Sequence, residues 1–237
     1  GRAGSPYAIK DYYDVNPDLA NNVRERMREF EDLVNRTHAH DLKVVIDFVP
    51  NHVARSYRSD AKPPGVNDLG EDDDVTVAFN RDNNFYYLPG QSFRPPSTEG
   101  AEAFSHPTKD GKFEEVPAKA TGNDEFTATP GIHSWYETVK LNYGVDIPNN
   151  RATHFEPVPD TWTKMRDILT FWAQKNIDGF RCDMAEMVPV EFWHWVIPQI
   201  KEINPNIIFI AEIYNSSQYR NYISHGKFDF LYDKVLL

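Results

Sequence analysis

The chain has 237 residues, of which 40% are hydrophobic and 26% are charged, and its formal net charge is −11. This length allows one large domain or two small ones with a substantial core. The acidic balance argues against a nucleic-acid partner and suits a neutral substrate such as a carbohydrate. The single cysteine, Cys182, excludes an intrachain disulfide framework and a cysteine-built metal site. No apolar run reaches the roughly 18 residues that suggest a membrane span, so no membrane partner is expected.

Helical and strand patterns alternate along the chain. Apolar residues at helical spacing predict helices, and short β-branched apolar runs predict buried strands. In chain order these are a helix over about 18–39, a strand over 44–49, a helix around 162–172, a strand over 177–183, a helix over 190–203, and strands over 207–213 and 228–232. The alternation indicates an α/β fold with a parallel sheet.

The connection after the first predicted strand is too long for a simple loop. Residues 53–156 are rich in Pro, Gly, Asn and Asp and show no long period. A structureless loop of that length is implausible in a compact domain, so an inserted subdomain is predicted between two barrel parts, 1–52 and 157–237. We interpret the acidic run at 71–74 as a solvated loop rather than a cation site.

Chemically capable side chains stand where the predicted strands end. They are Asp47, Asn51 and His52 after the first strand, Arg181 and Asp183 at the second, and Glu212 at the third. In a parallel barrel, the carboxyl ends of the strands meet at one face, where active sites are built. Arg181 and Asp183 are two residues apart on a strand, so their side chains point to the same side.

These carboxylates are expected to differ in protonation. The guanidinium of Arg181 favours an ionised Asp183, whereas the apolar sequence before Glu212 is expected to raise the pKa of that carboxyl group. One ionised and one protonated carboxyl group are what glycosidic bond cleavage requires. Taken alone, Arg181 and Asp183 could instead form a structural buried ion pair, and Glu212 could be a strand-terminal surface carboxylate.

The motifs resemble the α-amylase family, glycoside hydrolase family 13. Its strand-three motif D-x-x-x-N-H matches 47–52, its strand-four motif G-F-R-x-D matches 179–183, and its strand-five glutamate matches Glu212. The opening segment at 6–12 and the motif at 141–143 are similar to further family segments. The resemblance implies a partial (β/α)8 TIM barrel, strands three to six, with an irregular, domain B-like subdomain inserted after strand three.

The resemblance also implies a function. It predicts a retaining glycoside hydrolase that acts on α-1,4-linked glucans such as starch, glycogen and maltooligosaccharides through a covalent glycosyl-enzyme. The implied roles are nucleophile for Asp183, general acid/base for Glu212, substrate binding for Tyr7, His52 and Arg181, and structural support for Asp47 and Asn51. It further predicts carboxyl groups of Asp183 and Glu212 about 5–5.5 Å apart, with Tyr7 and His52 reaching the pocket of Asp183.

Three other functions stay open. An α-glucan transglycosylase or isomerase of the same family would use a different acceptor with the same chemistry, and a relative that binds glucan without catalysis would keep only the fold. A metal-dependent hydrolase built on Asp47, His52 and Asp183 is disfavoured, because His52 has no second histidine at a His-x-His or His-x-x-x-His spacing.

The chemistry requires no cofactor, and calcium is the one candidate ion, with Asn51 as its ligand as in calcium-dependent members. Two departures weaken that expectation: Glu186-Met187 replace the family's Lys-His after the nucleophile, and Lys140 replaces an Asp. Localisation stays open, with a secreted or periplasmic location favoured over a cytoplasmic one. The family's strand-seven aspartate has no counterpart here, so the chain is expected to be truncated at both ends and, made alone, inactive on starch.

Overall fold

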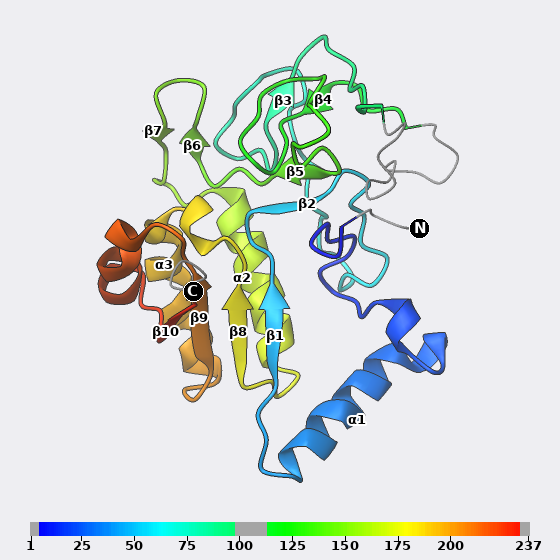
Figure 1. Cartoon of the computed structure of the whole chain (residues 1–237), viewed down its shortest axis with the longest axis vertical. Helices are drawn as coiled ribbons and strands as arrows, with labels where there is room; N and C mark the ends of the chain where they lie inside the picture. The colour runs from blue at the N-terminus through cyan, green and yellow to red at the C-terminus, as the bar shows by residue number, and fades with distance from the viewer. Residues whose placement is uncertain (1–4, 98–112, 233–237) are drawn as a thin grey trace. The chain divides into compact units, whose positions relative to one another are not determined.

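The computed structural model describes residues 5–97 and 113–232 (Figure 1). The chain forms two compact units. Unit 1 consists of residues 1–11 and 51–164, and unit 2 consists of residues 12–50 and 165–237. The segment assigned to the insertion, 53–156, therefore lies within unit 1, except that its part at 98–112 lies outside the described residues.

Unit 2 is built on a parallel sheet whose described strands have the order β1-β8-β9-β10. Their bounds are β1 (Val45–Phe48), β8 (Gly179–Cys182), β9 (Ile208–Glu212) and β10 (Phe230–Tyr232). Each of the four predicted strands is present, although each is shorter than its apolar run, and β1 and β10 are not fully buried, since Val45 and Phe230 are exposed. Gly179 is required where β8 and β9 approach, because a Cβ there would lie 2.5 Å from the Ile208 side chain.

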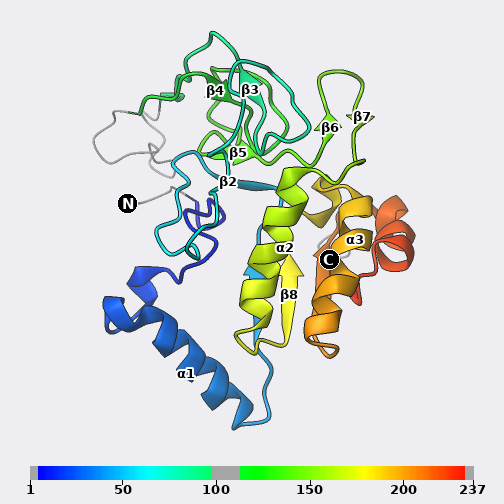
Figure 2. The same cartoon turned by 180° about the vertical axis from the view of Figure 1, so that it is seen from behind.

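Helices cover one face of this sheet. In Figures 1 and 2, α3 (Val190–Ile203) and the part of α2 (Asp160–Ala173) that belongs to unit 2 lie on the same side of the strands. They bury apolar side chains at helical spacing, namely Met165, Ile168, Leu169, Phe192, Val196 and Ile200. The third predicted helix is confirmed with the bounds expected from the sequence.

The first helix is shorter than predicted. The apolar pattern predicts a helix from about residue 18, but α1 covers Arg26–His38. Two short 3₁₀ turns, η1 (Pro17–Leu19) and η2 (Val23–Glu25), precede it. The side chains of Asn16 and Asn22 accept hydrogen bonds from backbone N–H groups two residues ahead, and these local bonds compete with a continuous helix.

The remaining helical turns of unit 2 follow its later strands. They are the 3₁₀ turns η3 (Ala185–Met187) and η4 (Ser216–Gln218) and the π-helical turn η5 (Asn221–His225). The hydroxyl group of Tyr222 in η5 donates to the backbone carbonyl groups of Glu186 and Val188, which ties η5 to the segment after β8.

Unit 1 contains short antiparallel strand pairs rather than a large sheet. Its described pairs are β2 (His52–Ala54) with β5 (Thr138–Lys140), β3 (Tyr87–Leu88) with β4 (Ala118–Lys119), and β6 (Val145–Asp146) with β7 (Ala152–Thr153). The opening segment joins this unit, because Ala54 N–H donates to the Ile9 carbonyl over 2.8 Å. In the acidic run, Asp73 accepts hydrogen bonds from the backbone N–H groups of Asn84 and Phe85, so this carboxylate organises the loop.

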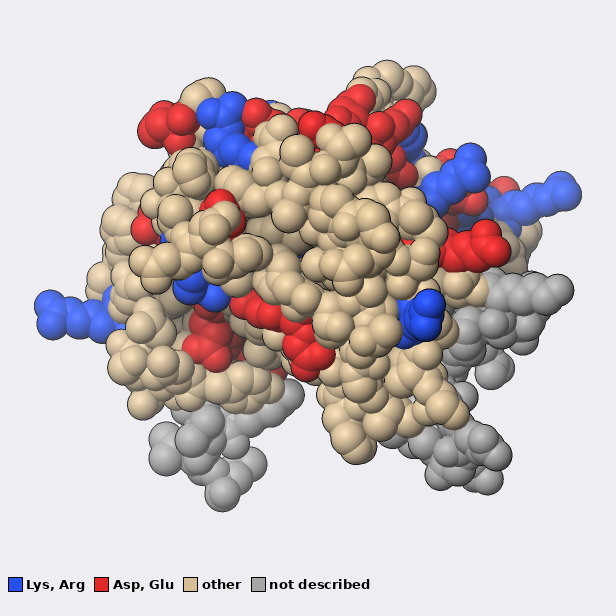
Figure 3. Space-filling view, turned by 90° about the horizontal axis from the view of Figure 1, so that it is seen from above, with Lys and Arg blue, Asp and Glu red and all other residues tan. Residues whose placement is uncertain are grey.

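Charged side chains are distributed without a basic area on the face drawn in Figure 3. There the described Lys and Arg side chains lie in separate spots among Asp and Glu side chains. Within the described ranges, no helix combines the length and the apolar character needed to cross a membrane.

Candidate active site

Three carboxylates from neighbouring strands of unit 2 converge on the guanidinium group of Arg181. Its Nη1 atom lies 2.8 Å from Asp47 Oδ1 and 3.1 Å from Asp183 Oδ1, and its Nη2 atom lies 2.7 Å from Glu212 Oε1. Asp47 on β1 is the register partner of Arg181 on β8. The predicted contact between Arg181 and Asp183 is confirmed, and the cluster lies at the carboxyl end of the sheet, where barrel enzymes build their active sites.

Glu212 is held by more groups than the sequence suggests. It is only 1% exposed, and besides Arg181 it accepts hydrogen bonds from Met184 N–H at 3.1 Å and from the Tyr214 hydroxyl at 2.8 Å. Met184 has left-handed backbone angles, φ 45° and ψ 41°. That conformation costs a residue with a side chain roughly 1–2 kcal/mol, and it is retained where the surroundings enforce it.

Burial and the neighbouring Glu212 favour the protonated form of Asp183. Asp183 is 6% exposed, and burial raises its pKa to about 7; the hydrogen bond and charge of Glu212 act in the same direction, while Arg181 opposes them. Asp183 is therefore protonated more readily than an ordinary aspartate. The expectation of a low pKa for Asp183 is wrong, because Asp183 is buried and Arg181 is shared among three carboxylates.

Two positioning groups beside Glu212 were not identified from the sequence. Tyr214 is two residues after Glu212, so strand alternation could have placed it on the same side. The carboxylate of Glu186 accepts hydrogen bonds from the backbone N–H groups of Tyr214 and Asn215, each at 3.1 Å. Glu186, one of the departures from the family motif, therefore fixes the segment that follows β9.

Tyr7 and His52 meet within unit 1, although they are far apart in the sequence. The His52 ring hydrogen-bonds the backbone of Tyr7, and its Nδ1 atom lies 3.1 Å from Asn51 Nδ2, which donates to it. The His52 ring also lies 5.2 Å from the ring of Trp135, measured between centroids. Because Asp183 belongs to unit 2, the expectation that Tyr7 and His52 reach its pocket stays a prediction.

We expect neutral, buried His52 to make the protein sensitive to acid. Burial, reinforced by the charge of Lys140, lowers the pKa of His52 from 6.5 to about 4. Between these pH values the unfolded chain binds more protons than the folded one, so stability falls as the pH falls. Across this pH range, the titration of His52 lowers the free energy of unfolding by about 3 kcal/mol. Urea unfolding at several pH values from 4 to 7 measures it.

The comparison for this measurement is His52→Gln, which cannot titrate. Its unfolding free energy should fall less steeply with acid than that of the wild type, by about 3 kcal/mol across the window. Parallel curves for the two proteins would show that His52 is not held neutral.

Asn51 does not fit the calcium role that the resemblance allows. Its Oδ1 atom accepts a hydrogen bond from the Lys140 ammonium group, which also lies 2.8 Å from Asp124 Oδ1. Calcium takes six to eight oxygen ligands at about 2.3–2.6 Å. Here the Lys140 ammonium already contacts Asn51 Oδ1 and Asp124 Oδ1, so no step of the chemistry is assigned to a metal ion.

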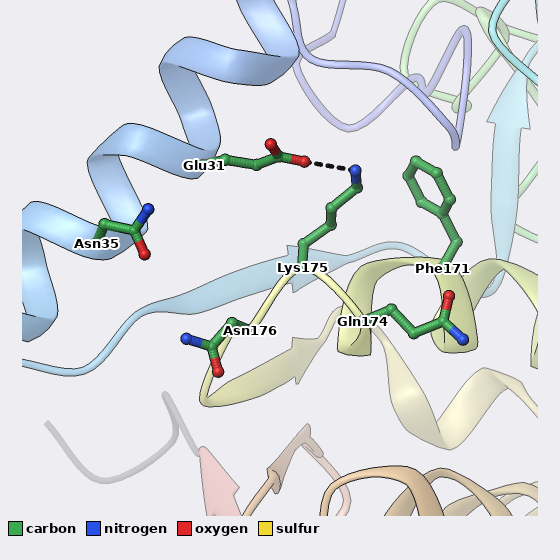
Figure 4. Close-up of a pocket in the computed structure, with 6 residues that line it drawn as sticks. All are labelled: Glu31, Asn35, Phe171, Gln174, Lys175 and Asn176. Carbon is green, nitrogen blue, oxygen red and sulfur yellow. Dashed lines mark hydrogen bonds and ion pairs between the residues drawn. The ribbon is translucent and has the colours of Figure 1, made fainter.

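A separate hollow of about 520 Å³ lies between α1 and the end of α2 (Figure 4). Its lining is Glu31, Asn35, Phe171, Gln174, Lys175 and Asn176. Lys175 Nζ spans it to Glu31 Oε1 at 2.5 Å. The hollow lies near the amino end of β8 and contains none of the predicted site residues.

A parallel sheet with helices on one face and carboxylates at its carboxyl end is the arrangement of a barrel enzyme. The family model described as "Alpha amylase, catalytic domain" matches residues 3–231. The chain therefore belongs to the α-amylase family, and it carries part of that family's (β/α)8 catalytic barrel.

The relatives include transferases and hydrolases. The chain is 25% identical over 238 residues to an alpha-1,4-glucan:maltose-1-phosphate maltosyltransferase of Cereibacter sphaeroides, covering 87% of the chain and 36% of the relative. It is 23% identical over 216 residues to alpha-amylase 3 of Dictyoglomus thermophilum, covering 89% and 33%. The chain thus spans about a third of the length of these relatives.

Solved structures share the fold. The debranching enzyme of Nostoc punctiforme matches with a TM-score of 0.57 at 18% identity, covering 95% of the chain and 35% of that structure. An alpha-amylase of Geobacillus thermoleovorans, complexed with acarbose, matches with a TM-score of 0.54 at 19% identity, covering 96% and 38%. At these identities the likeness establishes the fold alone.

Proposed function

We propose that the protein is a retaining glycoside hydrolase that acts on α-1,4-linked glucans. The observation that carries this proposal is that Asp183 and Glu212 both contact the guanidinium group of Arg181 at the carboxyl end of the sheet. Retaining enzymes keep their carboxyl groups about 5–5.5 Å apart, whereas inverting enzymes leave about 6.5–9.5 Å for a water molecule. Carboxyl groups that contact the two terminal nitrogens of one guanidinium group favour the shorter, retaining separation.

The proposed reaction has two steps. A carboxylate oxygen of Asp183 attacks the anomeric carbon while the bond to the leaving sugar oxygen breaks, and Glu212 gives its proton to that oxygen. Glu212 then takes a proton from water, the water oxygen attacks the anomeric carbon, and the bond to Asp183 breaks. Glu212 must therefore be protonated and Asp183 ionised when the first step begins.

The remaining assignments follow the resemblance. We assign sugar contacts to Tyr7, His52 and Arg181. With Nδ1 accepting from Asn51, the neutral His52 ring carries its single proton on Nε2; this N–H serves the hydrogen bond to the Tyr7 backbone, which a sugar hydroxyl would have to share or replace. Asp47 supports the site through its 2.8 Å contact with Arg181, and Asn51 supports His52.

Product stereochemistry tests the proposal. The natural gene product that contains this chain is incubated with maltoheptaose, and the first anomer released is read by proton NMR before mutarotation. A retaining mechanism releases the α-anomer. Early appearance of the β-anomer would overturn the nucleophile role of Asp183, because inversion uses no covalent intermediate.

Maltosyl transfer is the second candidate, because a maltosyltransferase is among the relatives. The same gene product is supplied with maltose 1-phosphate and maltohexaose. Transfer would release phosphate and lengthen the acceptor by two glucose units, whereas hydrolysis would create new reducing ends without lengthening it. The retaining pair serves both reactions, so this assay decides the acceptor and leaves the assignment of Asp183 and Glu212 intact.

A further inference from the structure

Unit 1 buries a lysine beside the proposed sugar-binding histidine. Lys140 ends β5 and is 3% exposed, and its Cα partner on β2 is His52. The Nζ atom lies 2.8 Å from Asp124 Oδ1 and donates to Asn51 Oδ1. A buried charge is costly unless it is paired and hydrogen-bonded, and here both conditions are met.

The ammonium group joins separate segments of unit 1. Asn51 precedes β2, Lys140 ends β5, and Asp124 lies in a turn, where it adopts a left-handed φ of 64°. Asn51 Nδ2 in turn donates to the carbonyl group of Gly122 at 2.7 Å. Gly122 has no space for a side chain, because a Cβ would lie 2.8 Å from the Cβ of His52. The turn is therefore closed tightly against the histidine.

We propose that the Lys140 ammonium is a built-in cation that takes the place of a structural metal ion at Asn51, so that this part of the protein is assembled without calcium. An ion bound at Asn51 Oδ1 would compete with the ammonium, which already contacts both this oxygen and Asp124 Oδ1. A divalent ion at that position would also meet the like charge of the lysine at contact distance. The second Asp124 oxygen lies 3.6 Å from Arg151 Nη1, a further cation.

The Lys140 amine faces an acidic partner in this arrangement. Burial lowers the pKa of Lys140, while the charge of Asp124 and the hydrogen bond with it raise this pKa. An ammonium group has three N–H donors and no acceptor, which suits the two oxygens that face it. Its charge also lowers the pKa of His52 across the strand pair. Lys140 thus positions His52 through Asn51 and helps to keep it neutral.

The first test uses the wild-type natural gene product. We expect its Tm to change by less than about 2 °C when millimolar calcium or excess EGTA is added, since a ligand that binds only the folded state would raise the Tm. Terbium, a luminescent substitute for calcium, should show no stoichiometric binding. A calcium-dependent rise in Tm together with saturable terbium binding would overturn the proposal, unless both persist unchanged in the variants below.

The second test replaces the lysine. Lys140→Met keeps the length of the side chain and removes its charge, so Asp124 loses its nearest partner. We expect the Tm of this variant to fall by about 10 °C, and we expect added calcium not to restore it. The pKa of His52, followed by NMR, should rise. Lys43→Met is the matched control, because Lys43 is 72% exposed and belongs to unit 2, and it should leave the Tm nearly unchanged. A Lys140→Met protein as stable as the wild type would refute the role of the ammonium.

Lys140→Asp supplies the reverse test. The new carboxylate adds oxygen ligands beside those of Asn51 and Asp124. We expect this variant to be less stable than the wild type, and we expect added calcium to raise its Tm by several degrees. If this variant does not fold in either condition, the wild-type and Lys140→Met measurements decide. A folded Lys140→Asp protein that is indifferent to calcium would show that no cation position exists there.

Discussion

Asp183→Ala is expected to abolish turnover of α-glucans, with a fall in kcat on the order of 10⁴–10⁶-fold, as for other enzymes that lose their nucleophile. Without this carboxylate no glycosyl-enzyme forms, and Glu212 and Arg181 alone cannot displace the leaving sugar. Turnover is measured by reducing-sugar release from soluble starch. Asp47→Asn is the comparison, because Asp47 also contacts Arg181 yet is assigned only a supporting role. Its loss should be at most about 100-fold.

A small anion distinguishes a lost nucleophile from a damaged site. The Asp183→Ala protein is given α-maltosyl fluoride, which needs little acid assistance, together with azide. Azide entering the space left by the carboxylate should displace fluoride and give β-maltosyl azide, the inverted product. Formation of the α-azide would mean that another group still forms the covalent intermediate, and Asp183 would lose its assignment.

The architecture of unit 2 could be predicted because its signals are local. The strands around Asp47 and Glu212 are apolar on both faces, as expected of parallel strands covered by helices, and the polar residues at the strand ends identify the face that carries chemistry. Strand alternation places Arg181 and Asp183 together without further information. These inferences use neighbouring residues only, and the structure confirms the contact that they predict.

The properties that the sequence did not predict depend on contacts between distant segments. The pKa of Asp183 is set by burial and by Glu212 on the next strand, whereas sequence reasoning considered only adjacent Arg181. The Met184 amide contacts Glu212 in a turn that no spacing identifies. The role of Lys140 depends on the antiparallel pairing of β2 with β5, strands separated by most of unit 1. Sequence reasoning identified Lys140 only as a departure from the family motif.

Glu212→Ala is expected to separate substrates by their leaving groups. Turnover of starch, whose leaving oxygen needs a proton, should fall by about 10²–10⁴-fold. Cleavage of α-maltosyl fluoride should be reduced far less in its first step, so the glycosyl-enzyme on Asp183 accumulates and can be detected by mass spectrometry of the intact protein. Azide should then attack that intermediate and give α-maltosyl azide, the retained product, opposite to the product of Asp183→Ala.

The pH dependence of this variant provides an independent check. Glu212 contributes the hydrogen bond and the charge that, after burial, raise the pKa of Asp183. Removing Glu212 should lower that pKa, so Asp183 stays ionised at lower pH and the acid limb of fluoride turnover moves to lower pH. Tyr214→Phe serves as the control, because it deletes only the 2.8 Å hydrogen bond to Glu212 and should reduce starch turnover about tenfold or less. Equal losses on starch and on fluoride, with no accumulated intermediate, would mean that Glu212 maintains the structure of the site and is not its acid.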